Sequence, residues 1–263
     1  MTITYDRPPM HYWTFCEELL KVPHLLIAGS SGSGKSVLIN SLIYTALGTR
    51  TPANCKFVFI DPKRVELREY ADLSRWTLGY CTEADDALIA LDYVINVMFQ
   101  RYAEMQAQGL RTYAGGDIYV VIDEYADLSI TAKKPLQERV IRISQLGRAA
   151  KIHLIIATQR PTADTINAAI KTNMDYRVAL HTAEAQHSRN IIGQRGAELL
   201  QIGQGYFYTP RGLRLEAIPY TSDAALTERV NWWRQHPGVI QPEPAPAPER
   251  KQKKGLLRLL RGA

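Results

Sequence analysis

Eight consecutive residues near the N-terminus have the composition of a loop that binds phosphate groups. They read GSSGSGKS and fit the pattern G-x-x-x-x-G-K-[ST], between an apolar run and a helical pattern. Glycines let backbone N–H groups point at phosphate oxygens, and the N-terminus of the next helix adds partial positive charge. We expect Lys35 to neutralise the β- and γ-phosphates of ATP, and Ser36 to hold Mg²⁺. The predicted nucleotide-binding residues are Gly29, Ser30, Ser31, Gly32, Ser33, Gly34, Lys35, Ser36 and Val37.

The stretch VVIDE carries the acidic residues that nucleotide hydrolysis requires. Its apolar residues indicate a strand, which places Asp123 at the carboxyl end, where open α/β sheets bind ligands. We expect Asp123 to bind Mg²⁺ through water, and Glu124 to orient and deprotonate the attacking water. The alternative is an acidic pair that only caps a helix. Together with the phosphate-binding loop, the pair predicts a Mg²⁺-dependent ATPase.

The elements that must position these residues alternate along the chain. Strands are predicted at 24–29, 55–61, 118–124 and 151–158, and helices at 13–21, 35–48, 83–108 and 135–148. Shorter strands are predicted at 176–181, 205–208 and 214–219, with helices at 184–193 and 222–235. Strands that alternate with helices predict an α/β fold with a mostly parallel, doubly wound sheet.

Composition divides the chain into a large body and two short ends. Residues 1–23 form a lead-in, 24–236 the α/β domain, 237–250 a Pro/Ala linker and 251–263 a basic tail with four leucines. The three cysteines are scattered, which indicates reduced thiols. No apolar stretch approaches the ~20 residues of a membrane helix, so we expect a cytoplasmic protein without a membrane-spanning segment.

The net charge of +6 is concentrated at the C-terminus. Residues 249–263 contain six basic residues and one acidic residue, so the rest of the chain is nearly neutral. Contacts with DNA in the body must therefore come from local basic loops. The tail has three interpretations: a solvated end, a docking peptide that folds on a protein partner, and, as a weaker option, a segment that binds a membrane surface.

The order of the features narrows the class of ATPase. The strand at 55–61 lies between the phosphate-binding loop and Asp123, a glutamate follows directly, and the next strand ends in Thr158 and Gln159. This is the layout of the additional-strand, catalytic-glutamate branch of P-loop ATPases, which small-molecule kinases and GTPases lack. Gln159 is placed to contact the γ-phosphate and sense its loss. The alternative is a glutamine that caps the start of a loop.

Five stretches resemble the motor of the FtsK/SpoIIIE family of DNA translocases. They are VPHLLIAGSSGSGKSVLIN, FVFIDPKRVELREY, VVIDEYADL, GRAAKIHLIIATQRPTADTINAAIKTNMDYRVAL and SRNIIGQRGAELLQIGQGYF, within about residues 20–220. The resemblance implies a RecA-like P-loop ATPase that forms a homo-hexameric ring and pumps double-stranded DNA through its centre.

The resemblance also implies roles for individual basic residues. A ring motor needs a cation from one subunit at its neighbour's γ-phosphate, and the family pattern assigns this arginine finger to Arg148, expected at the end of the helix 135–148. It places Arg160 and Arg189 near the DNA backbone, and we add Lys171 from the same region. For each of these residues the alternative is an ordinary solvated charge.

The sequence departs from the large members of the family. Their N-terminal membrane helices, long linker and C-terminal winged helix do not fit this sequence, so we expect a motor that serves a mobile element, plasmid or phage. FtsK-like motors also drive protein secretion, with peptides as substrates, and that is the alternative function. A non-motor nucleotide switch is a third possibility, against which the complete set of Lys35, Asp123 and Glu124 argues.

Overall fold

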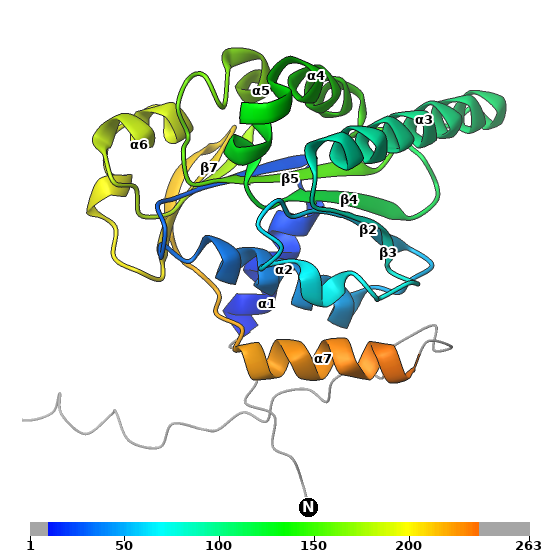
Figure 1. Cartoon of the computed structure of the whole chain (residues 1–263), viewed down its shortest axis with the longest axis horizontal. Coiled ribbons are helices and arrows are strands. Elements are labelled where there is room, and N and C mark those ends of the chain that lie inside the picture. The colour runs from blue at the N-terminus through cyan, green and yellow to red at the C-terminus, as the bar shows by residue number, and fades with distance from the viewer. Residues whose placement is uncertain (1–9, 237–263) are drawn as a thin grey trace, which may run out of the picture.

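An eight-stranded sheet with the order β3-β2-β4-β5-β1-β6-β7-β8 forms the centre of the molecule (Figure 1). The computed structural model describes residues 10–236, with side chains from residue 14 onward. The predicted linker at 237–250 and tail at 251–263 lie outside the described residues. Strands β3 to β6 of that order are parallel neighbours, and β7 and β8 add an antiparallel edge. The predicted mostly parallel α/β sheet is confirmed.

Seven of the eight strands of the sheet lie near their predicted positions along the chain. They are β1 (His24–Ala28), β2 (Cys55–Ile60), β3 (Thr77–Cys81), β4 (Asp117–Ile122), β5 (Ile152–Thr158), β6 (Tyr176–Ala179), β7 (Gln204–Thr209) and β8 (Gly212–Ala217). The central strands β1 and β5 are buried along their whole length. This burial explains their nearly continuous apolar sequences, because helices cover both faces of a parallel sheet.

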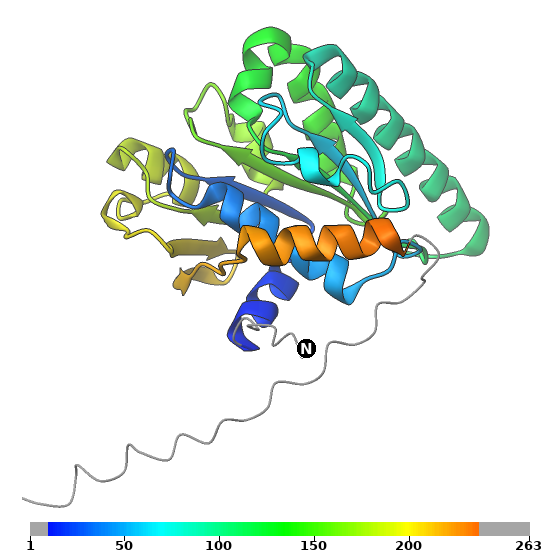
Figure 2. The ribbon, with the colours of Figure 1, turned by 60° about the horizontal axis from the view of Figure 1, so that its bottom comes forward.

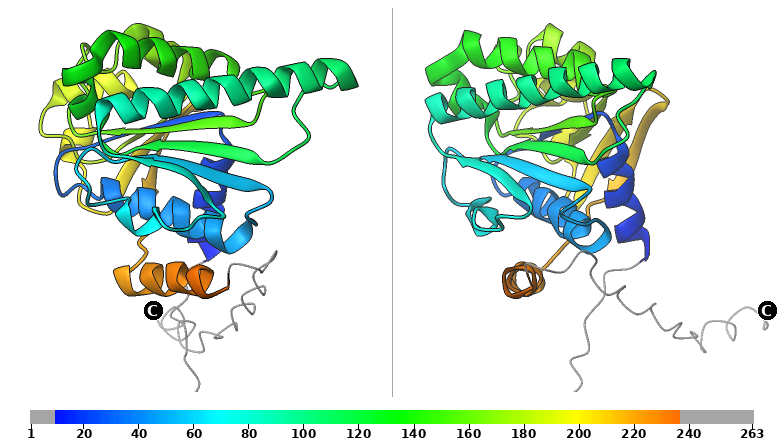
Figure 3. Two further views of the ribbon diagram at one scale, coloured as in Figure 1. Left: turned by 45° about the vertical axis from the view of Figure 1, so that its right-hand side comes forward. Right: turned by 90° about the vertical axis from the view of Figure 1, so that its right-hand side faces the viewer.

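Helices form one layer on each face of the sheet (Figures 2 and 3). One layer contains α1 (Met10–Lys21), α2 (Lys35–Thr49), α7 (Asp223–Gln235) and the 3₁₀ helix η1 (Arg68–Tyr70). The other contains α3 (Ala84–Gln108), α4 (Tyr125–Leu146), α5 (Ala168–Asn173), α6 (Ala185–Ile192) and the 3₁₀ helix η2 (Ala197–Leu199). Each layer and its face of the sheet share one hydrophobic core, as in a doubly wound fold.

Helix α2 is buried on nearly all sides, which fixes the phosphate-binding loop that precedes it. It packs between the sheet, α1 and α7, and its residues from Ser41 to Leu47 are all buried. A helix that is apolar all round must lie inside a fold. Its N-terminus therefore has a fixed position at the carboxyl end of β1.

Helix α4 is the largest difference from the predicted elements. It begins at Tyr125, ten residues before the expected start, and it bends at Ala132, whose φ is −131°. Pro135 lies just beyond this bend, where a helical turn without intact hydrogen bonds tolerates proline. The helix ends at Leu146, so Arg148 lies in the following turn rather than at the helix end as expected. The sequence prediction also missed β3 and α5, which have only five and six residues.

Candidate nucleotide-binding and hydrolysis site

The phosphate-binding loop needs its glycines for steric reasons. A Cβ on Gly29 would lie 2.4 Å from Ser33 Oγ and 2.8 Å from Leu180 Cβ, so a side chain there would collide with both. Gly32 and Gly34 have φ values of 75° and 94°, a region that glycine adopts without strain. Gly34 also forms the N-cap of α2, so the loop leads directly into the helix.

The loop rests on the carboxyl ends of β5 and β6, the two strands that flank β1 in the sheet. The N–H of Gly29 donates to the carbonyl of Thr158 at the end of β5, 3.3 Å away. The N–H and the hydroxyl of Ser30 both donate to the carbonyl of His181 after β6, at 2.8 and 3.0 Å. Ser33 Oγ is buried and has no protein partner within the described residues. A phosphate oxygen is the acceptor that such a hydroxyl in a glycine-rich loop would satisfy, so the loop fits the group predicted for it.

Lys35 and Asp123 form a buried ion pair at the mouth of the loop. Lys35 Nζ lies 2.8 Å from the carbonyl oxygen and 3.1 Å from Oδ1 of Asp123. The side chains are only 5% and 2% exposed, so each charge needs the other. The sequence predicted both residues for one site, and the structure brings them together although they are 88 positions apart. Ser36, the other predicted Mg²⁺ ligand, lies in the first turn of α2.

These oxygen ligands fit Mg²⁺, which proteins usually bind through one or two carboxylates together with substrate phosphates. Between residues 10 and 236 there is no group of three or more His, Cys, Asp or Glu residues that could hold a metal ion without a substrate. Asp123 and Ser36 supply oxygen donors of the kind that a Mg²⁺ site of this type uses.

Glu124 is buried beside Asp123, and the next strand fixes its side chain. The backbone N–H of Gln159 donates to both carboxylate oxygens of Glu124, at 3.0 and 3.1 Å. Strand β5, which ends just before Gln159, lies between β4 and β1 in the sheet. It is thus the additional strand between the acidic pair and the phosphate-binding loop. The backbone of Gln159 makes this contact with Glu124, and the contact of the Gln159 side chain with a γ-phosphate stays a prediction.

A lysine whose role the sequence prediction missed completes the surroundings of Glu124. Lys63 Nζ lies 3.5 Å from Glu124 Oε2 and 3.7 Å from Asp127 Oδ2. Lys63 belongs to the stretch IDPK, which contributed to the family resemblance without a role for its lysine. Asp61 of the same stretch is fully buried, and its Oδ1 has no protein partner within residues 10–236.

Arg148 is far from the site of its own subunit. It is exposed in the turn between α4 and β5, at the amino end of β5, whereas the phosphate-binding loop lies at the carboxyl ends of the strands. The seven residues of β5 rise about 3.3 Å each, so on the order of 20 Å separates the two ends. Within one subunit, Arg148 and the predicted nucleotide-binding residues are not brought together.

The predicted DNA-binding residues lie on three segments: the loop after β5, helix α5, which leads into the amino end of β6, and helix α6, which follows the carboxyl end of β6. Arg160 is exposed and directly follows Gln159, Lys171 is half-buried on α5, and Arg189 is exposed on α6. The side-chain amide of Asn190 donates to the carbonyl of Pro161 at 2.9 Å, which ties α6 to the loop that begins at Arg160. This link between the two elements was not predicted from the sequence.

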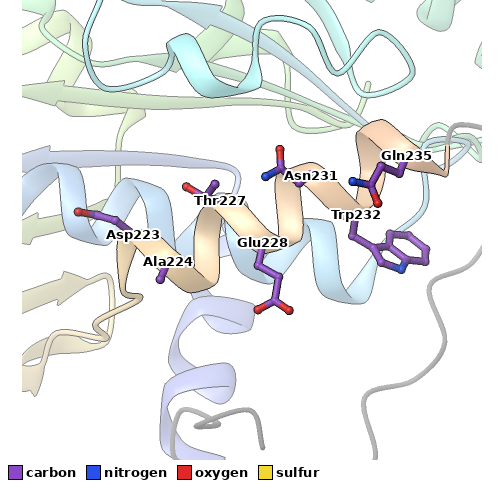
Figure 4. Close-up of a pocket in the computed structure, with 7 residues that line it drawn as sticks. All are labelled: Asp223, Ala224, Thr227, Glu228, Asn231, Trp232 and Gln235. Carbon is purple, nitrogen blue, oxygen red and sulfur yellow. The ribbon is translucent and has the colours of Figure 1, made fainter. Parts of the chain in front are cut away.

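A separate open pocket of about 600 Å³ lies along α7 (Figure 4). Its described lining residues are Asp223, Ala224, Thr227, Glu228, Asn231, Trp232 and Gln235, and none of them is a predicted site residue. No helix within residues 10–236 is long and apolar enough to cross a membrane.

The strand order, the loop and the acidic pair define a RecA-like P-loop ATPase fold. Solved structures have this fold: the conjugation coupling protein TcpA of pCW3, in its monomer form with ATPγS, has a TM-score of 0.71 and 24% identity over 82% of this chain and 66% of that chain. EssC (ATPases 2 and 3) of Geobacillus thermodenitrificans has a TM-score of 0.73 and 17% identity over 88% of this chain and 48% of that chain. At these identities the likeness concerns the fold alone.

The chain belongs to the FtsK/SpoIIIE family, whose model matches residues 13–119 and 116–163. It is 40% identical over 236 residues to the DNA translocase FtsK of Mycobacterium tuberculosis, and the match covers 79% of this chain and 28% of the relative. It is also 40% identical over 239 residues to the DNA translocase FtsK of Lactiplantibacillus plantarum, covering 82% of this chain and 30% of the relative. The chain thus spans less than a third of these relatives' length.

Proposed function

We propose that this chain is the motor of an ATP-driven double-stranded DNA translocase. The observation that carries the proposal is the direct contact between Glu124 and the backbone of Gln159, the residue before Arg160. The carboxylate of Glu124, the proposed general base, thus contacts the backbone one residue before Arg160, which we propose to contact DNA. Sequence identity favours DNA as the substrate, since it is 40% to relatives named DNA translocase but 24% to the solved Type VII secretion ATPase EccC of Thermomonospora curvata.

Nucleotide binding would depend on the loop from Gly29 to Val37. Backbone N–H groups and Lys35 would hold the phosphates of ATP, and Ser36 and Asp123 would hold Mg²⁺. The metal would neutralise phosphate charge in the transition state. Lys35 already contacts Asp123, so a small movement of its ammonium group is enough to serve both the carboxylate and a phosphate.

Hydrolysis would use Glu124 as the general base, with Gln159 beside it as the sensor of the γ-phosphate. Glu124 is buried, which keeps bulk water from its carboxylate and favours a single oriented water molecule. The backbone N–H of Gln159 is shared by both carboxylate oxygens and Lys63 Nζ lies 3.5 Å from Oε2, so Oε1 retains a lone pair for water.

Arg148 would act on the neighbouring subunit. Its place at the amino edge of the sheet makes action in its own site impossible without a large rearrangement, whereas a head-to-tail ring brings such an edge to a neighbour's site. A homo-hexameric ring therefore stays part of the proposal. Arg160, Lys171 and Arg189 would contact DNA phosphates, and the Asn190–Pro161 hydrogen bond would move α6 together with the loop after Gln159.

ATP turnover measured with and without long duplex DNA tests the proposed function. We expect Mg²⁺-dependent turnover that duplex DNA stimulates several-fold, and rings in negative-stain images of the same samples. The control variant is Lys35→Ala, which should lose turnover in both conditions. Turnover that ignores DNA but rises with an exported peptide would favour the secretion alternative, and turnover in the Lys35→Ala variant would contradict the site itself.

A further inference from the structure

We propose that Lys63 is a positioning residue for Glu124, and that it holds the glutamate's carboxylate together with the backbone N–H of Gln159. The proposal rests on the hydrolytic role proposed for Glu124 and adds a residue that acts through it. Neither the sequence motifs of the phosphate-binding loop nor the acidic pair assigns any function to this lysine.

The carboxylate of Glu124 is held from both neighbouring strands of the sheet. Strand β4, which leads to Glu124, lies between β2 and β5. From the side of β5, Gln159 donates its N–H to both carboxylate oxygens, and from the side of β2, Lys63 Nζ lies 3.5 Å from Oε2. The last torsion of a glutamate side chain has a broad energy profile, so neighbours must fix the direction of its oxygens.

Lys63 also compensates the charge of the buried Glu124 carboxylate. Glu124 is 1% exposed, and the adjacent Asp123 is equally buried but has Lys35 as its ion-pair partner. Among residues 14–236, Lys63 is the cation in an ion pair with Glu124, and it also lies 3.7 Å from Asp127. A buried carboxylate without a cation costs free energy, so Lys63 supplies a counter-charge to Glu124, although its side chain is 38% exposed and that of Lys35 only 5%.

The loop that carries Lys63 is closed by a buried aspartate. Asp61 Oδ2 accepts the N–H of Leu67 at 3.0 Å, and the carbonyl of Asp61 accepts the N–H of Arg64 at 3.1 Å. Leu67 is fully buried and anchors the far end of the loop. Burial, strengthened by the nearby charge of Asp61, raises the pKa of Tyr80, whose hydroxyl also contacts Asp61 Oδ2. The backbone of Lys63 is therefore anchored on both sides.

The Lys63→Gln variant tests the proposal by steady-state ATP hydrolysis. We expect kcat to fall about 10- to 100-fold, the range that misplacement of a catalytic group produces, while KM and ATP affinity stay unchanged. Lys63→Arg should restore turnover to within a few-fold, because it keeps a cation at this reach. The matched control is Arg64→Gln, which removes the same charge from the next residue, whose partner is the exposed Glu83. Its kcat should equal that of the unmodified protein.

A double-variant cycle separates positioning from a merely structural role. If Lys63 acts through Glu124, then Lys63→Gln should cause no further loss in a Glu124→Gln background, because the group it positions is already gone. An additive loss, or a kcat of Lys63→Gln that equals or exceeds that of the unmodified protein, would overturn the proposal. If Lys63→Gln unfolds at a lower temperature than the unmodified protein, the test uses Lys63→Arg alone. A tenfold loss of kcat in folded Lys63→Arg would then overturn the proposal.

The same data distinguish this proposal from the proposed function. An active protein in which Glu124→Gln is impaired but Lys63→Gln is not would refute only the role of Lys63. Normal turnover in the Glu124→Gln variant would instead refute the hydrolytic assignment on which both depend.

Discussion

The two edges of the central sheet differ in whether the protein satisfies their buried polar groups. At the amino edge, Arg50 donates two hydrogen bonds to Glu17, and His153 contacts Asp117 at 3.0 Å. The carboxyl edge also has ion pairs, at Lys35 and Lys63, but Ser33 Oγ and Asp61 Oδ1 there are buried without protein partners within the described residues.

Two buried nitrogen atoms at the amino edge also lack a partner within the described residues, the Nε2 of His24 and the Nε1 of Trp76, but neither carries a charge. Burial, together with the nearby His153, lowers the pKa of His24 to about 3, so its imidazole is neutral at physiological pH. Within the described residues, the buried hydroxyl and carboxylate groups that lack a protein partner are therefore at the carboxyl edge. The difference indicates that the amino edge serves stability and the carboxyl edge serves ligands.

The strongest test of this comparison removes a single group from the carboxyl edge. Glu124→Gln should bind ATP but hydrolyse it about 10²- to 10⁴-fold more slowly, because the attacking water loses its general base while the phosphate-binding loop is unchanged. Lys35→Ala should lose binding or turnover altogether. Nucleotide binding by fluorescence and turnover by phosphate release would separate the two defects. Normal hydrolysis by Glu124→Gln would mean that the carboxyl edge has been misinterpreted.

Arg148 is the exception that sharpens the comparison, because a residue of the amino edge is expected to act in catalysis. Arg148→Ala should keep ATP binding and ring formation but lose hydrolysis about 10³-fold, the size of an arginine-finger effect. Mixing Arg148→Ala with Glu124→Gln subunits should restore part of the turnover, since some interfaces then combine an intact arginine with an intact glutamate. If the mixture stays as inactive as its components, Arg148 does not act in trans.

Removal of the basic groups beside the site should cause a smaller effect that depends on DNA. Arg160→Ala and Arg189→Ala should abolish the several-fold stimulation by duplex DNA and spare turnover without DNA. The unmodified protein should bind DNA without sequence preference and more weakly as salt rises, because phosphate contacts release counterions. Affinity that is insensitive to salt, or that requires a short sequence, would contradict this assignment.

The comparison of the edges also explains what the sequence could predict. Lys35, Asp123 and Glu124 were placed in one site because parallel strands carry their ligands at the same edge, and a strong motif marked each of them. Strands β1, β2, β4 and β5 were recognisable because burial on both faces makes their sequences continuously apolar.

What the sequence missed depends on contacts between distant segments. The lysine at position 63 reaches Glu124 only because β2 is the neighbour of β4, which no local pattern reveals. The early start of α4 was hidden by Pro135, which locally signals a helix start but here follows a bend inside a longer helix. The hydrogen bond from the backbone N–H of Gln159 to Glu124 could not be predicted from residue types, because every residue except proline has such an N–H.

The smallest expected effect belongs to the amino edge and concerns stability rather than turnover. Burial alone would raise the pKa of Glu17, but hydrogen bonds from Arg50 and Thr49 outweigh it and lower the pKa below its ordinary value. A carboxylate with a lowered pKa stabilises the fold above its unfolded pKa, and this stabilisation is lost as pH falls through the folded value. Glu17→Gln should therefore lower the free energy of unfolding by about 1 kcal/mol at pH 7.

Urea unfolding at a series of pH values would measure this contribution. The difference in the free energy of unfolding between the variant and the unmodified protein should shrink as pH falls below about 4, near the ordinary pKa of glutamate. ATP turnover at pH 7 should not change, because Glu17 and Arg50 contact no group of the site. Glu18→Gln is the matched control on the same helix, since Glu18 pairs with the half-exposed Arg214 in a surface bridge that contributes little. A loss of turnover in folded Glu17→Gln, with unfolding unchanged, would mean that the amino edge takes part in catalysis within its own subunit.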